Sequence, residues 1–189
     1  MHRRAVFLDR DGVLNKAILR DGRPHPPPTV DALELLPGVA SALASLRDDG
    51  FLLVVVSNQP DVARGSTTLE AVEAINDRLV QALPIDLVLV CYHDDADDCA
   101  CRKPRPGLLV EGSRRLGIDL AHSYMVGDRW RDIDAGRAAG CVTVFVDYGY
   151  AERAPENPDH VVRSLSEAAA IIRQRERPTH LPTDQREVD

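Results

Sequence analysis

The sequence predicts one α/β domain in which a doubly wound, mostly parallel sheet of Rossmann-like type is covered by helices on both faces. Short apolar segments typical of buried strands alternate along the chain with segments of helical periodicity. The 189 residues suit a single domain, and their hydrophobic fraction of 44% is enough for a sizeable core. No segment approaches the roughly 18 apolar residues of a membrane helix, so we expect no membrane partner.

Five strands and five helices follow from this alternation. The first strand ends at Leu8, where Asp9 interrupts the apolar run Val6-Phe7-Leu8. Continuous apolar or β-branched runs predict four more strands, over residues 51–56, 87–91, 123–126 and 143–147. Apolar residues at helical spacing, bounded by glycine or proline, predict helices between residues 38 and 50 and over 69–83, 107–116, 132–139 and 165–175.

Two polar segments interrupt or follow this pattern. Residues 20–30 contain Pro26-Pro27-Pro28, which excludes a helix, and they form either a simple connection or a flap over a site. Residues 177–189 are polar and contain proline, so we expect a disordered tail there. The predicted domain therefore spans residues 1–176.

Charge and cysteine content narrow the function class. The net charge of −7 argues against broad nucleic-acid binding, which needs a basic face, although a local cation cluster can still hold a small anion. The N-terminal apolar stretch is too short for the core of a signal peptide. Three of the four cysteines are clustered, as in metal sites of reducing compartments. We expect a cytoplasmic monomer.

Polar side chains follow the predicted strands at the sheet edge where open α/β folds bind ligands. In chain order these residues are Asp9, Asp11, Ser57, Asn58, Gln59, Lys103, Asp128 and Asp132. Each has an ordinary alternative, because Asp-x-Asp-Gly occurs in surface turns, serine and aspartate cap helices, and a lysine can be solvated. Their convergence on one edge favours a site.

This set suits phosphoryl transfer. Asp9 and Asp128 would hold Mg²⁺, and the Asp9 carboxylate would attack a phosphate to form an aspartyl-phosphate. Ser57 would bind the phosphoryl oxygens, and Lys103 would stabilise the charge that develops on them. Asp11 would protonate the leaving oxygen and later activate water.

A second cluster lies between residues 91 and 101. Cys91, His93, Cys99 and Cys101 supply three thiols and an imidazole, which suit a tetrahedral Zn²⁺ with no position left for catalysis. We expect a structural zinc that orders this loop and the adjacent Arg102 and Lys103. The alternative is a group of reduced surface cysteines with a solvated histidine.

Four motifs in order resemble those of the haloacid dehalogenase-like phosphatase superfamily. They are Phe7-Leu8-Asp9-Arg10-Asp11-Gly12, Val56-Ser57-Asn58, Lys103 within Cys101-Arg102-Lys103-Pro104, and Gly127-Asp128-Arg129-Trp130-Arg131-Asp132. The resemblance implies that Asp9 is nucleophile and magnesium ligand and that Asp11 is the acid/base, with its backbone carbonyl on the metal. It also implies that Asp128 completes the metal site and that Asp132 is an acidic residue behind it.

The zinc loop is similar to that of one branch of this superfamily. The branch contains the heptose-1,7-bisphosphate 7-phosphatases and the histidinol-phosphate phosphatases and lacks a large cap domain. The resemblance implies hydrolysis of a small phosphorylated sugar, with D-glycero-D-manno-heptose 1,7-bisphosphate first and histidinol phosphate as the alternative. Arg64 and Arg102 are candidate contacts to the substrate's distal groups, and Asn58 joins Ser57 as a phosphate-binding candidate.

Two segments depart from the branch. Pro60-Asp61 replaces a more common Ser-Gly pair, and Pro26-Pro27-Pro28 replaces the aromatic and acidic residues common in heptose enzymes. Both departures concern substrate selection. Two other functions remain alternatives. One is of another class, a module that binds a phosphorylated ligand without turnover. The other is a nucleic-acid 3′-phosphatase, which the acidic charge balance opposes.

Overall fold

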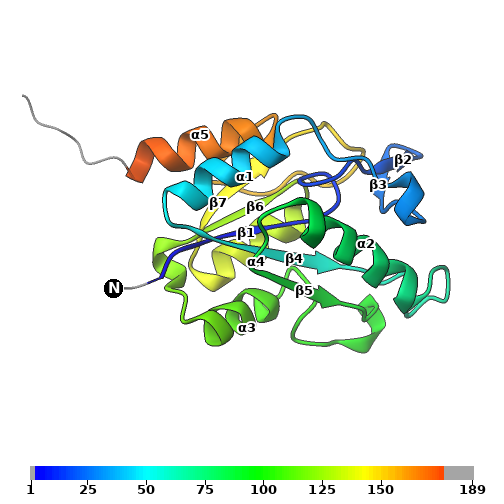
Figure 1. The fold of residues 1–189 in the computed structure, drawn as a ribbon. Coiled ribbons are helices and arrows are strands. Elements are labelled where there is room, and N and C mark those ends of the chain that lie inside the picture. The colour runs from blue at the N-terminus through cyan, green and yellow to red at the C-terminus, as the bar shows by residue number, and fades with distance from the viewer. Residues whose placement is uncertain (1–2, 177–189) are drawn as a thin grey trace, which may run out of the picture.

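The computed structural model describes residues 3–176 and contains a six-stranded parallel sheet with helices on both faces (Figure 1). The strand order is β5-β4-β1-β6-β7-β8, and every neighbouring pair is parallel. The strands are β1 (Ala5–Leu8), β4 (Leu52–Asn58), β5 (Leu87–Cys91), β6 (Tyr124–Gly127), β7 (Val142–Val146) and β8 (His160–Val162). The doubly wound parallel sheet predicted from the sequence is confirmed. The tail predicted at 177–189 lies outside the described residues.

Two groups of helices cover the sheet. One face packs on α1 (Val39–Asp48), α2 (Leu69–Ala82) and α5 (Leu165–Glu176), and the other on α3 (Gly107–Leu116) and α4 (Trp130–Ala139). Figure 1 shows α1 and α5 side by side on the first face. Short 3₁₀ helices occupy Val30–Ala32, Asp95–Asp97 and Leu120–His122. None of the helices within residues 3–176 has the length and hydrophobicity needed to cross a membrane.

The central strand β1 explains why its sequence is apolar without alternation. All four of its residues are buried, with Val6 and Leu8 in the core of one face and Ala5 and Phe7 in the core of the other. A strand covered on both faces gains from an apolar side chain at every position. Truncating Phe7 to alanine would destabilise such a core by about 3–5 kcal/mol. The rigid strand carries Asp9 directly at its end, where the Asp9 N–H donates to the Val126 carbonyl at 2.9 Å.

A hairpin that the sequence prediction missed spans residues 18–25 and overlaps the segment 20–30, which was expected to be a connection or a flap. β2 (Ile18–Arg20) pairs antiparallel with β3 (Arg23–His25). Asp21 and Gly22 form the turn with φ values of 50° and 72°, as two-residue hairpin turns require. Pro24 concealed the strand, yet proline is tolerated in a two-stranded ribbon, where a ladder N–H need not be present at every position.

The sixth sheet strand, β8, was also missed. It has three residues, lies at the sheet edge beside β7, and exposes Val161. Such a short edge strand lacks the apolar run that marks buried strands.

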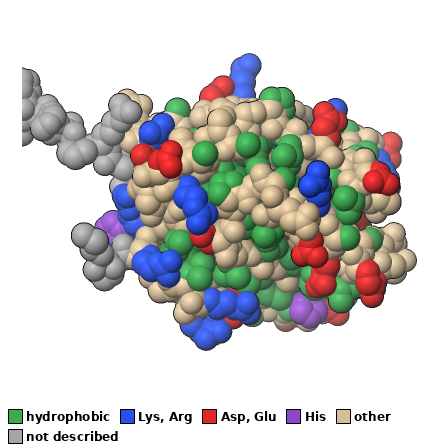
Figure 2. Space-filling view, viewed as in Figure 1, with side chains coloured by type: hydrophobic (Ala, Val, Ile, Leu, Met, Phe, Trp, Pro, Cys, Tyr) green, Lys and Arg blue, Asp and Glu red, His purple; other side chains and the backbone are tan. Residues whose placement is uncertain are grey.

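On the face shown in Figure 2, basic and acidic side chains are interspersed and form no continuous basic stripe. Among the described residues, the segments inserted after β1 and β4 contain nothing larger than the hairpin and one 3₁₀ turn.

Candidate active site

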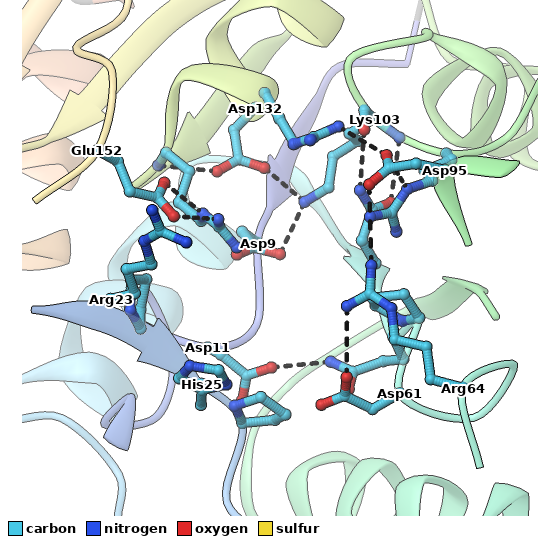
Figure 3. A pocket seen from close by; sticks show the side chains of 18 residues that line it. Asp9, Asp11, Arg23, His25, Asp61, Arg64, Asp95, Lys103, Asp132 and Glu152 are labelled. Atoms are coloured by element: carbon cyan, nitrogen blue, oxygen red, sulfur yellow. Dashed lines mark hydrogen bonds and ion pairs between the residues drawn. The ribbon is translucent and has the colours of Figure 1, made fainter. Parts of the chain in front are cut away.

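A cavity of about 280 Å³ opens at the C-terminal ends of the central strands (Figure 3). We call three buried residues that line it, Asp9, Lys103 and Asp132, together with the adjoining Asp128, the floor. We call the ionisable side chains around its mouth the rim; they are Arg23, His25, Asp61, Arg64, Asp95, Arg102, Arg129, Arg131 and Glu152. The floor comes from the ends of β1 and β6, from the loop before α3 and from the first turn of α4, whereas the rim comes from the hairpin, from loops and, for Arg131, from α4.

Lys103 is the centre of the floor. Its Nζ lies 2.7 Å from Asp9 Oδ1 and 2.5 Å from Asp132 Oδ1, and it donates to the Val56 carbonyl at 2.8 Å. Burial alone would lower the pKa of Lys103, but Asp132 and Asp9 raise it above its ordinary value. The ammonium group therefore stays charged where the negative charge of a phosphate would be held.

Asp132 has a structural role as well as an electrostatic one. Its Oδ2 accepts from the Arg129 N–H at 3.0 Å at the N-terminus of α4, while its Oδ1 holds Lys103. A carboxylate at a helix N-terminus satisfies a free N–H and faces the positive end of the helix dipole. The start of α4 thus fixes the lysine of the floor.

Three carboxylates of the floor converge. Ligand oxygens of Asp9, Asp128 and Asp132 lie within 4.8 Å of one another. Burial raises the pKa of Asp9 to about 6 against the opposing effect of Lys103, and burial followed by Asp9 and Asp132 raises the pKa of Asp128 well above its usual range. Such a group favours a bound dication, whose charge offsets the repulsion.

Asp128 is the clearest sign of a missing partner. Both of its carboxylate oxygens are buried without a hydrogen bond of ordinary geometry to a described residue, although the Tyr150 hydroxyl is near enough to lower the pKa. Buried polar atoms without partners are rare in native proteins. Gly12 makes room for this group: a Cβ there would lie 1.8 Å from Asp128 Oδ2, and its φ of 92° also favours glycine.

Asp11 lies beside the floor and lines the cavity, and four hydrogen bonds hold its carboxylate. Oδ2 accepts from Arg10 Nε at 3.1 Å, from Arg10 Nη2 at 2.9 Å and from Gln59 Nε2 at 2.8 Å, while Oδ1 accepts from Asn15 Nδ2 at 2.9 Å. Arg10 is fully buried and also donates to Asn76 at 2.9 Å. The carboxylate is therefore held in one orientation.

The two phosphate-binding candidates after β4 have different surroundings. Ser57 is buried, and its Oγ accepts from Gln59 Nε2 at 2.9 Å. The Asn58 side chain is bound to the backbone of Lys103: its Nδ2 donates to the Lys103 carbonyl at 3.0 Å, and its Oδ1 accepts from the Lys103 N–H at 3.1 Å. Asn58 lines the cavity, but both polar ends of its side chain hold the chain that carries the lysine.

The four predicted zinc ligands form a compact cluster. Five of the six distances between the thiol sulfurs of Cys91, Cys99 and Cys101 and Nδ1 of His93 lie between 3.3 and 3.6 Å. These distances are too long for a disulfide and near the ~3.8 Å that separates sulfurs around tetrahedral Zn²⁺ with Zn–S of about 2.3 Å. Burial raises the pKa of the Cys91 thiol. The donor set and spacing fit zinc.

The rim is a network of arginine–carboxylate pairs. Asp95 Oδ1 accepts from Arg102 Nε at 2.8 Å and from Arg131 Nη1 at 3.1 Å. Arg64 pairs with Asp94 on the zinc loop, with Nε 3.0 Å from Oδ2, and lies 3.6 Å from Asp61. On the opposite side Arg129 pairs with Glu152, and Figure 3 shows Arg23 and His25 of the hairpin facing the cavity.

The structure brings the residues predicted from the strand ends together, and it adds several neighbours that the sequence did not indicate. Arg10 and Gln59, which hold Asp11, and Arg129 and Arg131 of the rim received no role. The position of Arg10 between two candidate catalytic aspartates was an available signal. No comparable signal marked Arg23, because its hairpin was not predicted.

Comparison with known proteins agrees with this geometry. Residues 100–168 match the family model described as HAD-hydrolase-like. The chain is similar to the D-glycero-D-manno-heptose-1,7-bisphosphate 7-phosphatase of Thermosynechococcus vestitus, with 36% identity over 91% of this chain and 96% of the relative. It is also similar to the D-glycero-beta-D-manno-heptose-1,7-bisphosphate 7-phosphatase of Escherichia coli, with 35% identity over 92% of this chain and 96% of the relative.

A solved structure shares the fold over nearly the whole described chain. The D,D-heptose 1,7-bisphosphate phosphatase of B. bronchiseptica, crystallised with magnesium and phosphate, has a TM-score of 0.78 and 33% identity. The match covers 92% of this chain and 99% of that one.

Proposed function

This chain belongs to the haloacid dehalogenase-like phosphatases, in the family of the D-glycero-D-manno-heptose-1,7-bisphosphate 7-phosphatases, and from this premise we propose that it removes the 7-phosphate of heptose 1,7-bisphosphate. The observation that carries the proposal is the floor: a buried lysine joins the candidate nucleophile Asp9 to Asp132, beside Asp128, whose carboxylate oxygens accept no hydrogen bond of ordinary geometry from the described residues. We assign residues 1–176 to one phosphatase domain. Four free cysteines fit a reducing compartment, and we propose a cytoplasmic location.

The residues of the floor, together with Asp11 and Ser57 beside it, suggest a two-step reaction. Asp9 attacks phosphorus, the bond from phosphorus to the sugar oxygen breaks, and protonated Asp11 donates its proton to that leaving oxygen. Water then attacks phosphorus, the bond to Asp9 breaks, and Asp11 takes the proton that the water loses. Lys103 and Ser57 bind the phosphoryl oxygens through both steps.

Two metals fit residues of this chain. Asp9, Asp128 and the Asp11 carbonyl are the proposed Mg²⁺ ligands, supported by the converging carboxylates and by the unpartnered oxygens of Asp128. Mg²⁺ would supply positive charge that offsets repulsion between a carboxylate and a phosphate. Cys91, His93, Cys99 and Cys101 are the proposed ligands of a structural Zn²⁺, supported by their mutual distances.

The rim is suited to the second phosphate of a bisphosphate. Three of its arginines, Arg64, Arg102 and Arg131, meet the carboxylates of Asp94 and Asp95 near the cavity. Guanidinium groups bind phosphate oxygens with paired hydrogen bonds. A distal phosphate would compete with Asp95 for these groups, which supports a bisphosphate over a substrate with one phosphate.

A phosphate-release screen tests the proposal. Purified protein with Mg²⁺ is given heptose 1,7-bisphosphate, the corresponding monophosphates, other sugar bisphosphates and histidinol phosphate, and kcat/KM is compared. We expect the heptose bisphosphate to have the highest kcat/KM. A preference for histidinol phosphate by more than about ten-fold would reject the sugar and retain the phosphatase. No release from any of them would reject the enzyme and favour a binding module.

A further inference from the structure

Gln59 connects three parts of the site. It follows β4 and is 1% exposed. Its Nε2 donates to Asp11 Oδ2 at 2.8 Å and to Ser57 Oγ at 2.9 Å, and its backbone N–H donates to the carbonyl of Cys91 at 2.7 Å. One amide therefore touches the proposed acid/base and the proposed phosphate-binding hydroxyl, while its backbone is tied to a proposed zinc ligand.

The chemistry of these partners determines the orientation of the amide. Only the amino end of a glutamine can donate to the Asp11 carboxylate, and its second hydrogen is directed at Ser57. Ser57 Oγ is then an acceptor toward Gln59, so its own hydrogen is available for a phosphoryl oxygen. Oε1 of Gln59 is buried without a partner among the described residues, and the contacts of the side chain are those of its amino group.

The donors around Asp11 are unequally divided. Oδ2 accepts three hydrogen bonds, two from Arg10 and one from Gln59, whereas Oδ1 accepts one from Asn15. Gln59 supplies one of the three donors that hold Oδ2, so it helps to set the orientation of the Asp11 carboxyl group.

We propose that Gln59 is a positioning residue that holds the Asp11 carboxyl group in the orientation needed for proton transfer and keeps the Ser57 hydroxyl turned toward the phosphate. The inference rests on the proposed phosphatase activity and adds a residue to it. In the first step the proton passes from Asp11 to the leaving oxygen as its bond to phosphorus breaks. Gln59 neither gains nor loses a proton.

Dependence on the leaving group tests this role. An alkoxide leaving group needs a proton, whereas p-nitrophenolate leaves without one. In Gln59→Met, which keeps length and removes both donors, we expect kcat for an alkyl phosphate to fall ~10–100-fold and kcat for p-nitrophenyl phosphate to fall less than about three-fold. Gln81→Met, on the exposed side of α2, is the matched control and should leave both rates unchanged.

Other results would overturn the proposal. Equal losses for both substrates would show that Gln59 merely maintains the pocket, and unchanged rates would show that Asp11 needs no positioning. Gln59→Leu repeats the comparison if the methionine variant fails to fold, and the same split is expected because leucine also lacks the donors. Any alkyl phosphate that the wild type hydrolyses can be used, so rejection of the heptose substrate leaves this test intact.

Discussion

The floor and the rim of the cavity are built in different ways. Lys103, Asp128 and Asp132 of the floor are each no more than 2% exposed; Lys103 is hydrogen-bonded to Val56 of β4, and Asp132 is hydrogen-bonded to the start of α4. In the rim, Arg64 and Asp95 have 44% and 55% of their side chains exposed. The floor is part of the core, whereas the rim is at least partly exposed except for Arg102, which is buried.

This difference suggests that the floor performs the chemical steps and that the rim selects the substrate. A buried ion pair that loses one partner leaves an uncompensated charge and costs about 3–5 kcal/mol, so the floor tolerates little change. Exposed pairs contribute ~0–1 kcal/mol and are screened by salt, so the rim can exchange partners with an incoming ligand. The following experiments test that division, beginning with the largest expected effect.

Removing the nucleophile should abolish the chemistry and leave binding. Asp9→Asn is expected to lower kcat by ~10⁴-fold or more, because an amide cannot form the aspartyl-phosphate. Orthophosphate binding, measured by calorimetry with Mg²⁺, should persist. Asp21→Asn, in the exposed hairpin turn, is the matched control. Activity of Asp9→Asn comparable to the wild type would contradict the assignment and the proposed role of the floor.

Removing one proposed zinc ligand should disorder the loop and thereby displace Lys103 of the floor. Cys99→Ser is expected to lose the single zinc found by elemental analysis and to lower kcat/KM by ~10–100-fold, because the loop leads directly to Lys103. Cys141→Ser, a buried cysteine outside the cluster, should keep its zinc. A zinc-free protein with full activity would show that the floor does not depend on this loop.

The burial of Asp9 in the floor should also affect how the free energy of unfolding depends on pH in the absence of Mg²⁺. Because burial raises the pKa of Asp9 from 3.8 to about 6, the folded protein holds a proton that the unfolded chain releases. The free energy of unfolding therefore falls as pH rises from about 4 to about 6, by on the order of 2–3 kcal/mol from this group.

Urea titrations in magnesium-free buffer at several pH values measure this loss. Asp9→Asn should lack the Asp9 part of the decline, and Asp21→Asn should retain it. Added Mg²⁺ should restore stability to the wild type at pH 7. Identical pH dependence in wild type and Asp9→Asn would mean that Asp9 ionises as freely in the fold as in the unfolded chain.

The rim should give the smallest and most selective effects. Arg102→Ala is expected to raise KM for a bisphosphate ~3–30-fold and to leave kcat nearly unchanged, since it removes binding alone. Arg23→Ala, on the hairpin, should have an effect of about two- to five-fold. Arg114→Ala, exposed on α3, is the control. A large fall in kcat in either rim variant would assign the rim a part in the chemistry.

The floor could be predicted because each of its residues follows a recognisable strand or lies in a motif. Asp9 ends an apolar run, and Asp128 follows the fourth predicted strand. Parallel strands necessarily bring their carboxyl ends to one edge. The grouping of the zinc ligands was also predictable, since four soft donors within eleven residues can reach a common centre.

The rim could not be predicted in the same way. Arg23 and Glu152 line one cavity although more than one hundred residues separate them, and their positions depend on loop conformations rather than on a strand. The hairpin itself was obscured by Pro24 and by its polar sequence. The hydrogen bonds around Asp11 were also unpredictable, because Gln59 reaches it from a different strand.

The contacts of Asn58 have a consequence for protein engineering. Asn58 pairs with Cys91 in the sheet, and its side chain holds the backbone of Lys103 on the far side of the zinc loop. The loop therefore starts beside Asn58 and returns to it. Because the proposed zinc ligands and Lys103 must keep their places, we expect residues 94–98, between His93 and Cys99, to be the part of the loop whose length or sequence can change without displacing the lysine.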